Sequence, residues 1–163
     1  MITFLEGNMI ELSPAHAVIE CGGVGYYLNI SLNTFAKFEN TKAKVKFYTY
    51  LSIKEDSHTL YGFFDKQERE CFILLLSVSG VGASTARMIL SSLNPHELQR
   101  VIVNEDVGAL KSVKGIGLKS AQRIIIDLKD KMHIDSTLAP SMLDKNNSVK
   151  QESLYALEKL GFS

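Results

Sequence analysis

The chain has little of what secreted, membrane-spanning or zinc-dependent proteins need. Its 163 residues include only two cysteines, Cys21 and Cys71, which are too few for a disulfide framework or a cysteine-based zinc site. The longest apolar run, Cys71–Leu76, is far shorter than the ~20 residues that cross a bilayer. No basic start followed by an apolar stretch opens the sequence. We therefore expect a reduced, cytoplasmic protein without a membrane segment or an export signal.

Patterns for catalysis and cofactor binding are also missing. The four histidines have no metal-ligand spacing, and no Ser-His-Asp set is implied. The Gly22–Gly25 cluster lacks the Lys-Ser/Thr and the helix of a phosphate loop, so it predicts a hairpin turn. We expect no cofactor, no metal and no catalytic activity in the chain itself, so any ATP use must come from a partner.

A net charge of zero hides an uneven distribution of charge along the chain. Residues 1–63 hold five Lys and Arg against six Asp and Glu, whereas residues 64–134 hold ten against eight. Residues 111–131 alone hold six against two, a net charge of +4. The zero total by itself argues against a nucleic-acid partner, but a local excess of this kind is compatible with one.

The first third of the chain predicts a small closed β-barrel. Apolar residues alternate with polar ones from Val45 to Ile53, which places one set on a core face. Little helical pattern is present, and several short apolar runs follow one another in about sixty residues. The six predicted strands are residues 2–4, 9–12, 17–21, 26–30, 45–53 and 59–63.

From Phe64 the period becomes helical. Asp65 followed by Glu68 is a capping-box start, and Asn94-Pro95-His96-Glu97 is a second helix start. The expected buried residues of the two helices are Phe72, Leu75, Leu76, Leu98, Val101 and Ile102.

The last part of the chain predicts a linker and one more helix. Residues 135–147 have linker composition, and Ser148 with Gln151 caps a helix whose Leu154, Leu157 and Leu160 face inward. The predicted organisation is therefore α+β and multidomain. It has a barrel over 1–63, helical hairpins over 64–134, a linker over 135–147 and a helix of a C-terminal domain over 148–163.

An internal repeat carries the functional prediction. Residues 75–89 and 110–124 match at a constant offset of 35, with Gly80-Val81-Gly82 aligned to Gly115-Ile116-Gly117. The glycines permit a tight hairpin between two helices, and the apolar residue between them packs against the helix pair. Ala86 and Ala121 allow close helix approach. The pattern predicts two helix-hairpin-helix units.

Such a hairpin suits a phosphate group. The second helix of each unit begins with free backbone N–H groups and a positive dipole end. Ser84 and Lys119 hold equivalent positions one turn in, and Arg123 follows in the next turn. An ordinary helical hairpin is the alternative for one Gly-x-Gly, but two in register favour phosphate binding without base recognition.

The combination of barrel, paired hairpins, linker and helical end resembles the RuvA family, the subunit of the bacterial branch-migration complex that binds Holliday junctions. The resemblance covers nearly the whole chain. The matching stretches are the Met-Ile start, Gly22–Tyr26, Glu55-Asp56, Leu60–Phe63, Lys66–Arg69, Gly80–Gly82, Val107–Leu110, Gly115–Gly117 and Leu160–Phe162.

The resemblance implies an OB-type barrel that builds a homotetramer or, on DNA, an octamer, with hairpins that grip the minor-groove side of four DNA arms. Glu55 and Asp56 match acidic pins, whose charge repels phosphates at the crossover and holds the junction open and square-planar. By themselves these two residues would be a solvated hairpin tip. The tail helix, with Leu154, Leu157, Leu160 and Phe162, would recruit the RuvB hexameric ATPase. The RuvC resolvase, recombination, DNA repair and the SOS response belong to the same expectation.

The sequence departs from the family in two places. In the first hairpin, Ala83-Ser84 stands where a basic residue often follows the glycines, which predicts a weaker grip. The sequence ends about one helix into the expected tail domain, so docking of the ATPase depends on whether more chain follows.

Three other functions are compatible with parts of the sequence. A helix-hairpin-helix DNA glycosylase would use Lys119 and Asp135, although a preceding barrel is foreign to that architecture. Single-strand binding would use stacking on Tyr26, Tyr27, Phe47, Tyr48 and Tyr50, which more often fill a core or an interface. A protein-interaction adaptor would show no salt-sensitive DNA binding.

Overall fold

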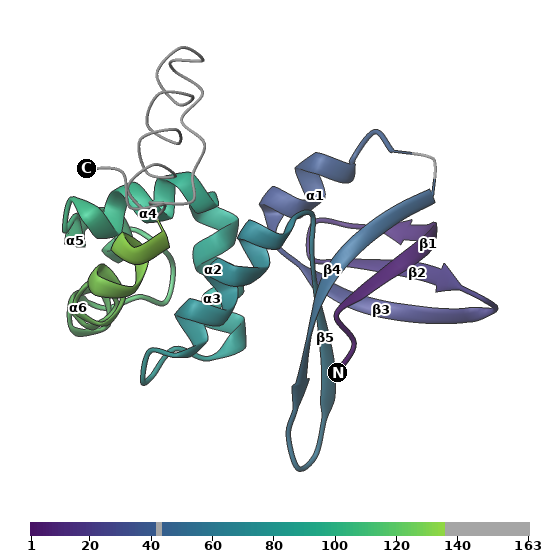
Figure 1. The fold of residues 1–163 in the computed structure, drawn as a ribbon, viewed down its shortest axis with the longest axis horizontal. Coiled ribbons are helices and arrows are strands. Elements are labelled where there is room, and N and C mark those ends of the chain that lie inside the picture. Colours follow the sequence, from purple (N-terminus) through teal and green to yellow (C-terminus); the bar gives the residue numbers. More distant parts are fainter. Residues whose placement is uncertain (42–43, 136–163) are drawn as a thin grey trace, which may run out of the picture. The chain divides into compact units, whose positions relative to one another are not determined.

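The structure, a computed structural model, describes residues 1–41 and 44–135, with the backbone alone from residue 133 (Figure 1). The chain divides into two units, Met1–His133 and Ile134–Ser163. Nearly all of the predicted linker, and the whole predicted tail helix with Leu154, Leu157, Leu160 and Phe162, lie outside the described residues.

The first part of the larger unit is a closed five-stranded barrel, as the alternating pattern predicts. The strands are β1 (Phe4–Leu12), β2 (His16–Cys21), β3 (Val24–Ile30), β4 (Lys44–Ile53) and β5 (His58–Phe63). Their order around the barrel is β1-β2-β3-β5-β4, and β3 pairs with β5 in parallel while the other pairs are antiparallel. The barrel core is formed by Leu5, Ala17, Ile19, Leu28, Ile30, Phe38, Val45 and Phe47.

Two features of the barrel differ from the sequence prediction. The two predicted strands 2–4 and 9–12 are one strand, because Gly7 continues the strand where β1 passes very close to β2. A Cβ on Gly7 would lie 1.9 Å from the carbonyl oxygen of Glu20. The second feature is α1 (Leu32–Phe38), a helix between β3 and β4 that the prediction missed. It begins at the cap Ser31, whose hydroxyl accepts a hydrogen bond from the Thr34 N–H.

The glycine cluster is a hairpin turn, as predicted. Gly22 and Gly23 lie between β2 and β3 with φ of +61° and +84°, a conformation that favours glycine. The predicted alternation along β4 holds for Val45, Phe47 and Thr49, which are buried. It fails at Ile53, which is 66% exposed, because β4 and β5 continue as a long two-stranded hairpin (Figure 1).

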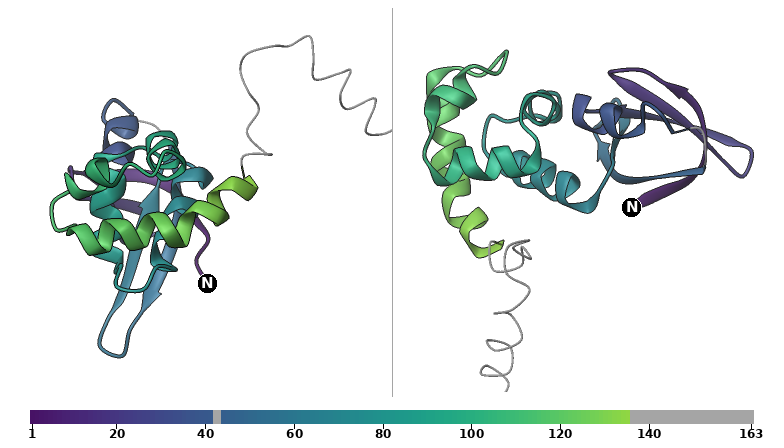
Figure 2. Two further views of the ribbon diagram at one scale, coloured as in Figure 1. Left: turned by 90° about the vertical axis from the view of Figure 1, so that its left-hand side faces the viewer. Right: turned by 90° about the horizontal axis from the view of Figure 1, so that it is seen from above.

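The second part of the larger unit is helical. Its elements are α2 (Lys66–Leu76), α3 (Ala83–Ser92), α4 (Pro95–Val103), α5 (Val107–Lys111) and α6 (Leu118–Asp135). In the left view of Figure 2, α6 runs across the other helices. The expected core residues Phe72, Leu75, Leu98, Val101 and Ile102 are buried, whereas Leu76 is only half-buried. Asn94 and Glu97 form the reciprocal capping box that was predicted for α4.

Candidate nucleic-acid interface

The first helix-hairpin-helix unit consists of α2, the hairpin 77–82 and α3. Two backbone bonds fold the hairpin: the Val78 N–H donates to the Leu75 carbonyl, and the Val81 N–H donates to the Val78 carbonyl, both at 3.1 Å. Val78 and Val81 are buried, so they anchor the hairpin in the helical core. Gly80 has φ of +87°, a region where other residues are strained.

The second unit, α5 with hairpin 112–117 and α6, repeats this geometry bond for bond. The Val113 N–H donates to the Leu110 carbonyl and the Ile116 N–H to the Val113 carbonyl, again both at 3.1 Å. Gly115 also has φ of +87°. The repeat in the sequence is therefore a repeat in structure, with an apolar anchor and a left-handed glycine at equivalent places.

A pair of serines extends the match to the start of each hairpin. The hydroxyl of Ser77 donates to the Leu74 carbonyl at 2.7 Å, and the hydroxyl of Ser112 donates to the Ala109 carbonyl at 2.7 Å. Serine at the end of a helix thus turns its hydroxyl back onto the last turn in both units.

The N-terminus of α3 is open, unlike those of α1, α2, α4 and α5. Helices α1, α2, α4 and α5 begin at Ser31, Asp65, Asn94 and Asp106, whose side chains each accept a backbone N–H. Helix α3 begins at Gly82, and no side chain in the described part caps it. Its first helical bond runs from the Ala86 N–H to the Gly82 carbonyl, so earlier N–H groups have no helical partner.

Glycine at position 82 is not explained by the fold. Its φ of −87° and ψ of 170° are accessible to any residue, and an added Cβ would meet no described atom within 4 Å. The same open space surrounds Gly117. Because Ser, Asp or Asn would accept these N–H groups, glycine here leaves the amides uncovered and available to a ligand.

The side chains predicted to join the phosphate contact lie where the repeat places them. Ser84, Lys119 and Arg123 are exposed. Ala86 and Ala121 are fully buried, and the Ala121 N–H donates to the Gly117 carbonyl at 2.9 Å, as Ala86 does to Gly82. These contacts are compatible with an anion site at each hairpin.

Most of the positive charge of residues 111–131 stays available. Within the described residues, Lys129 is the member of this group that forms an ion pair, with Glu105. Their hydrogen bond lowers the pKa of the Glu105 carboxyl and raises the pKa of Lys129. Lys129 is therefore neutralised locally, whereas Lys119 and Arg123 are not.

A buried carboxylate positions the first hairpin against the barrel. Glu68 on α2 is 3% exposed and accepts hydrogen bonds from the hydroxyls of Ser31 and Thr34. The Phe64 N–H donates to the Thr34 hydroxyl at 3.1 Å, which closes the link between α1 and the chain entering α2. Burial raises the pKa of Glu68, and the two hydroxyl bonds oppose that rise.

This role of Glu68 corrects the sequence prediction. Asp65 caps α2 through the Glu68 N–H, as predicted, but the Glu68 side chain does not complete the capping box. It turns to the N-terminal end of α1, whose existence the sequence prediction missed. A serine followed by threonine three residues later, Ser31 and Thr34, was the available signal.

Helix α3 is also fixed to the barrel. The Arg87 guanidinium donates to the Ala15 carbonyl at 3.0 Å and to the Ile30 carbonyl at 3.4 Å. The Leu32 N–H donates to the Ser91 hydroxyl at 3.1 Å. The first hairpin is therefore held to the barrel from both of its helices.

Glu55 and Asp56 lie at the tip of the β4–β5 hairpin. Both are exposed, and the turn is closed by the Lys54 N–H, which donates to the Ser57 carbonyl at 2.8 Å. The strands that carry them extend beyond the barrel core, so the two carboxylates face solvent rather than the core.

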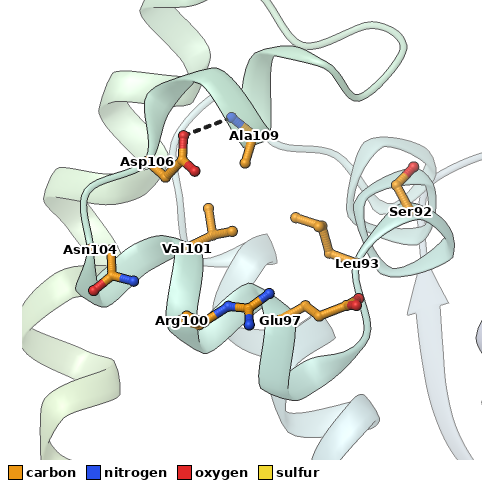
Figure 3. A pocket seen from close by; sticks show the side chains of 8 residues that line it. All are labelled: Ser92, Leu93, Glu97, Arg100, Val101, Asn104, Asp106 and Ala109. Carbon is orange, nitrogen blue, oxygen red and sulfur yellow. Dashed lines mark hydrogen bonds between the residues drawn. The ribbon is translucent and has the colours of Figure 1, made fainter.

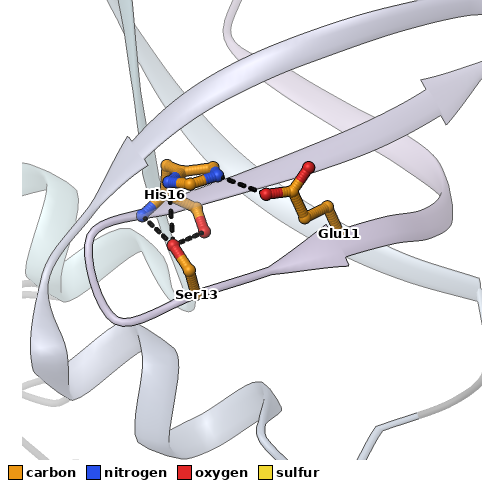
Figure 4. A network of polar contacts seen from close by, with 3 residues as sticks. All are labelled: Glu11, Ser13 and His16. Carbon is orange, nitrogen blue, oxygen red and sulfur yellow. Dashed lines mark hydrogen bonds and ion pairs between the residues drawn. The ribbon is translucent and has the colours of Figure 1, made fainter.

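The network in Figure 4 contains a serine, a histidine and a carboxylate, and it is a turn rather than a catalytic set. His16 lies 2.8 Å from the Ser13 hydroxyl and 2.7 Å from a Glu11 oxygen. However, the Ser13 hydroxyl also bonds the backbone N–H and carbonyl of His16, so it is committed to the β1–β2 turn.

The glycosylase alternative does not fit the helix geometry. Lys119 and Asp135 both lie on α6, sixteen residues apart in one continuous helix. At 1.5 Å per residue their backbones are about 24 Å apart along the axis. One substrate base cannot contact both.

The aromatic side chains predicted for single-strand binding all lie in the described barrel, and the contacts of four of them are separate. Phe47 is fully buried in the barrel core, and Tyr50 packs edge-on against Phe72 in the helical core. Tyr27 stacks on His16, and Tyr48 is surrounded by the cations of Lys46, Lys66 and Arg69. The prediction that such residues mainly fill core positions is confirmed for Phe47.

A shallow pocket of about 220 Å³ lies where α3, α4 and α5 meet (Figure 3). Two of its polar side chains serve the local fold: the Asp106 carboxylate accepts the Ala109 N–H, and Glu97 belongs to the α4 capping box. In the part of the chain that the structure describes, no group of three metal-binding side chains occurs. No helix there is long and apolar enough to cross a bilayer.

Comparison with known proteins assigns the chain to a family. Residues 1–62 match the RuvA N terminal domain, and residues 72–130 match the SAM-like helix-hairpin-helix tandem. The Holliday junction branch migration complex subunit RuvA of Christiangramia forsetii is 55% identical over 163 residues, which cover 100% of this chain and 84% of that protein. Proteins of the same name are 51% identical in Bacteroides fragilis (100% of this chain, 85% of that protein) and 50% identical in Flavobacterium psychrophilum (99% and 83%). The resemblance in the sequence is thereby confirmed: the chain belongs to the RuvA family.

Proposed function

We propose that the chain binds four-way DNA junctions, as the DNA-binding subunit of a branch-migration complex in recombination and repair. The observation that carries the proposal is the pair of hairpins with equal backbone geometry, each followed by a helix that begins at an unobstructed glycine. The names of its relatives, Holliday junction branch migration complex subunit RuvA, support the same function.

Each hairpin holds one phosphate through backbone amides. Val81 and Ile116 anchor the two hairpins, and exposed side chains add to the contact. Because this site offers amides and cations but no group that reads base edges, recognition depends on the positions of phosphates rather than on sequence. The proposed contact residues are Gly80, Val81, Gly82, Ser84, Gly115, Ile116, Gly117, Lys119 and Arg123.

Junction selectivity requires several copies around one crossover. We propose a homotetramer built through the barrels, with an octamer on DNA as the larger alternative. Large apolar side chains on the barrel support self-association, since Phe4, Ile10, Val24 and Tyr27 are 51%, 64%, 50% and 55% exposed. Glu55 and Asp56 from each copy would then repel phosphates at the crossover and hold the junction open and square-planar.

The remaining parts of the proposal concern partners and domains. The chain itself carries no ATPase activity, which belongs to the hexameric RuvB motor, and RuvC acts on the same junction. We assign barrel assembly to residues 1–63, DNA binding to 64–134, a linker to 135–147 and motor recruitment to 148–163. The setting is the bacterial cytoplasm, within the SOS response.

A competition titration tests this function. A labelled four-way junction is bound by the protein and displaced by linear duplex of the same arm sequence. We expect strong preference for the junction and a complex of tetramer size or larger. Equal affinity for both DNAs would leave a general phosphate-binding module and refute junction recognition.

A further inference from the structure

The two hairpins differ in the cation that their own chain segment supplies. Lys119 follows the second hairpin, whereas Ser84 occupies the equivalent position after the first. A hydroxyl cannot neutralise a phosphate, so the first site would lack the charge-assisted contact that the second has. The structure brings a lysine from another element to the start of the first hairpin.

Lys131 is the residue that reaches the first hairpin. It lies near the C-terminal end of α6, and its ammonium donates a hydrogen bond to the Ser77 hydroxyl at 2.9 Å. Ser77 is the first residue of the hairpin 77–82, and the bond from the Val81 N–H to the Val78 carbonyl folds that hairpin back on itself. Ser77 and Gly82 therefore stand at the two ends of one turn.

The ammonium is free to bind an anion at this position. Lys131 is exposed, and among the described residues it forms no ion pair, in contrast to Lys129, which pairs with Glu105. The bond to Ser77 uses one of its three donors. Helix α6 thus begins at the second hairpin, and Lys131, about 20 Å further along the helix axis, places a cation at the first hairpin.

We infer that Lys131 supplies the cationic phosphate contact of the first hairpin, in place of the basic residue that Ser84 does not provide. This inference rests on the proposed function, because it assumes that the first hairpin holds a phosphate. One helix then equips both DNA sites: its N-terminus and Lys119 serve the second hairpin, and Lys131 serves the first.

A different role would also explain the hydrogen bond to Ser77. A lysine beside the C-terminal end of α2 complements the negative end of the helix dipole and would stabilise the fold without touching DNA. The two roles differ in what a substitution changes. Removing a phosphate-binding cation lowers the salt dependence of DNA binding, whereas removing a cation that only faces the helix dipole lowers the free energy of unfolding alone.

The test compares Lys131→Ala with Lys129→Ala, a matched control two residues away whose charge is already paired. Junction binding is titrated at several salt concentrations, and urea unfolding is followed in parallel. We expect Lys131→Ala to lower the slope of log K against log salt by about 0.9 for each phosphate that is no longer neutralised, and Lys129→Ala to leave it unchanged. Adding Ser84→Lys to Lys131→Ala should restore the slope, because it returns a cation to the first hairpin from its own helix.

The outcomes separate this inference from the proposed function. If Lys119→Ala lowers the salt slope while Lys131→Ala changes only the unfolding curve, the assignment of Lys131 is refuted and phosphate binding by the hairpins stands. If the unaltered protein shows no salt-dependent binding to the junction, both are refuted. A slope reduced by Lys131→Ala and restored by Ser84→Lys supports both.

Discussion

Replacing Gly82 with aspartate should stabilise the helix that follows it and at the same time weaken DNA binding. Aspartate is among the best N-cap residues, and relative to glycine it contributes a few tenths of a kcal/mol to helix stability. No strain offsets this gain, because Gly82 has an ordinary backbone conformation and an added Cβ would meet no described atom within 4 Å.

The effect on binding has the opposite sign. The new carboxylate would accept the amide hydrogens at the start of α3, which we assign to a phosphate, and it would add a negative charge beside the DNA backbone. A hydrogen bond to a charged group contributes about 1.5–3 kcal/mol. Since 1.4 kcal/mol is tenfold in affinity, we expect affinity to fall roughly ten- to a hundredfold for each hairpin that no longer holds its phosphate.

Gly82→Ala provides the matched control. It adds a Cβ in the same open space without supplying an acceptor, so binding should stay close to that of the unaltered protein. The measurements are junction titrations and urea unfolding on all three proteins. If Gly82→Asp is more stable and binds the junction as tightly as before, the amides of α3 do not hold a phosphate and the argument from the open N-terminus is wrong.

Three further predictions address the second hairpin, the β4–β5 tip and the buried carboxylate. Lys119→Ala should weaken binding to all DNA sequences alike and lower the salt slope by about 0.9 for each phosphate that its ammonium no longer neutralises; an unchanged slope in salt titrations would contradict the assignment. Glu55→Gln with Asp56→Asn should leave junction affinity equal or higher in the same titration, because repulsion is removed, and a large decrease would show another role. For Glu68, burial raises the pKa above the ordinary 4.5, so the folded state binds a proton more tightly than the unfolded state. The free energy of unfolding, measured in urea, should therefore fall as pH rises from about 4.5 through the folded pKa. Glu68→Gln should not show this fall. A free energy of unfolding that rises with pH over this range because of Glu68 would refute the prediction.

The sequence predicted those parts of the fold that depend on local patterns. Alternation along β4 indicated a strand, the Asn94–Glu97 capping box located the start of α4, and the 35-residue repeat located both hairpins. Each of these signals consists of residues in or beside the element it specifies, and the repeat only shows the same local signal twice, so one sequence is enough to detect it.

What the sequence could not predict depends on contacts between distant residues. The sequence prediction divided β1 into residues 2–4 and 9–12, because the close approach of Gly7 to the Glu20 carbonyl involves another strand. Glu68 looked like half of a capping box, although its carboxylate bonds hydroxyls more than thirty residues away. Lys131 looked like one of several lysines on a helix, and only its distance to Ser77 connects it with the first hairpin.

The starts of the helices show where stability and DNA binding compete. The side chains of Asp65 and Asn94 accept backbone N–H groups that we expect no ligand to bind. Such a cap contributes about 1 kcal/mol to stability relative to a residue that cannot cap. Gly82 stands at a helix start where no side chain of the described residues accepts the amides, and the fold alone gives no reason for glycine there. A selection for stability alone would favour Asp or Ser at that position. We therefore attribute this glycine to the ligand proposed above, which needs the amides, and for this reason the substitution that most improves the helix is the one expected to harm the function.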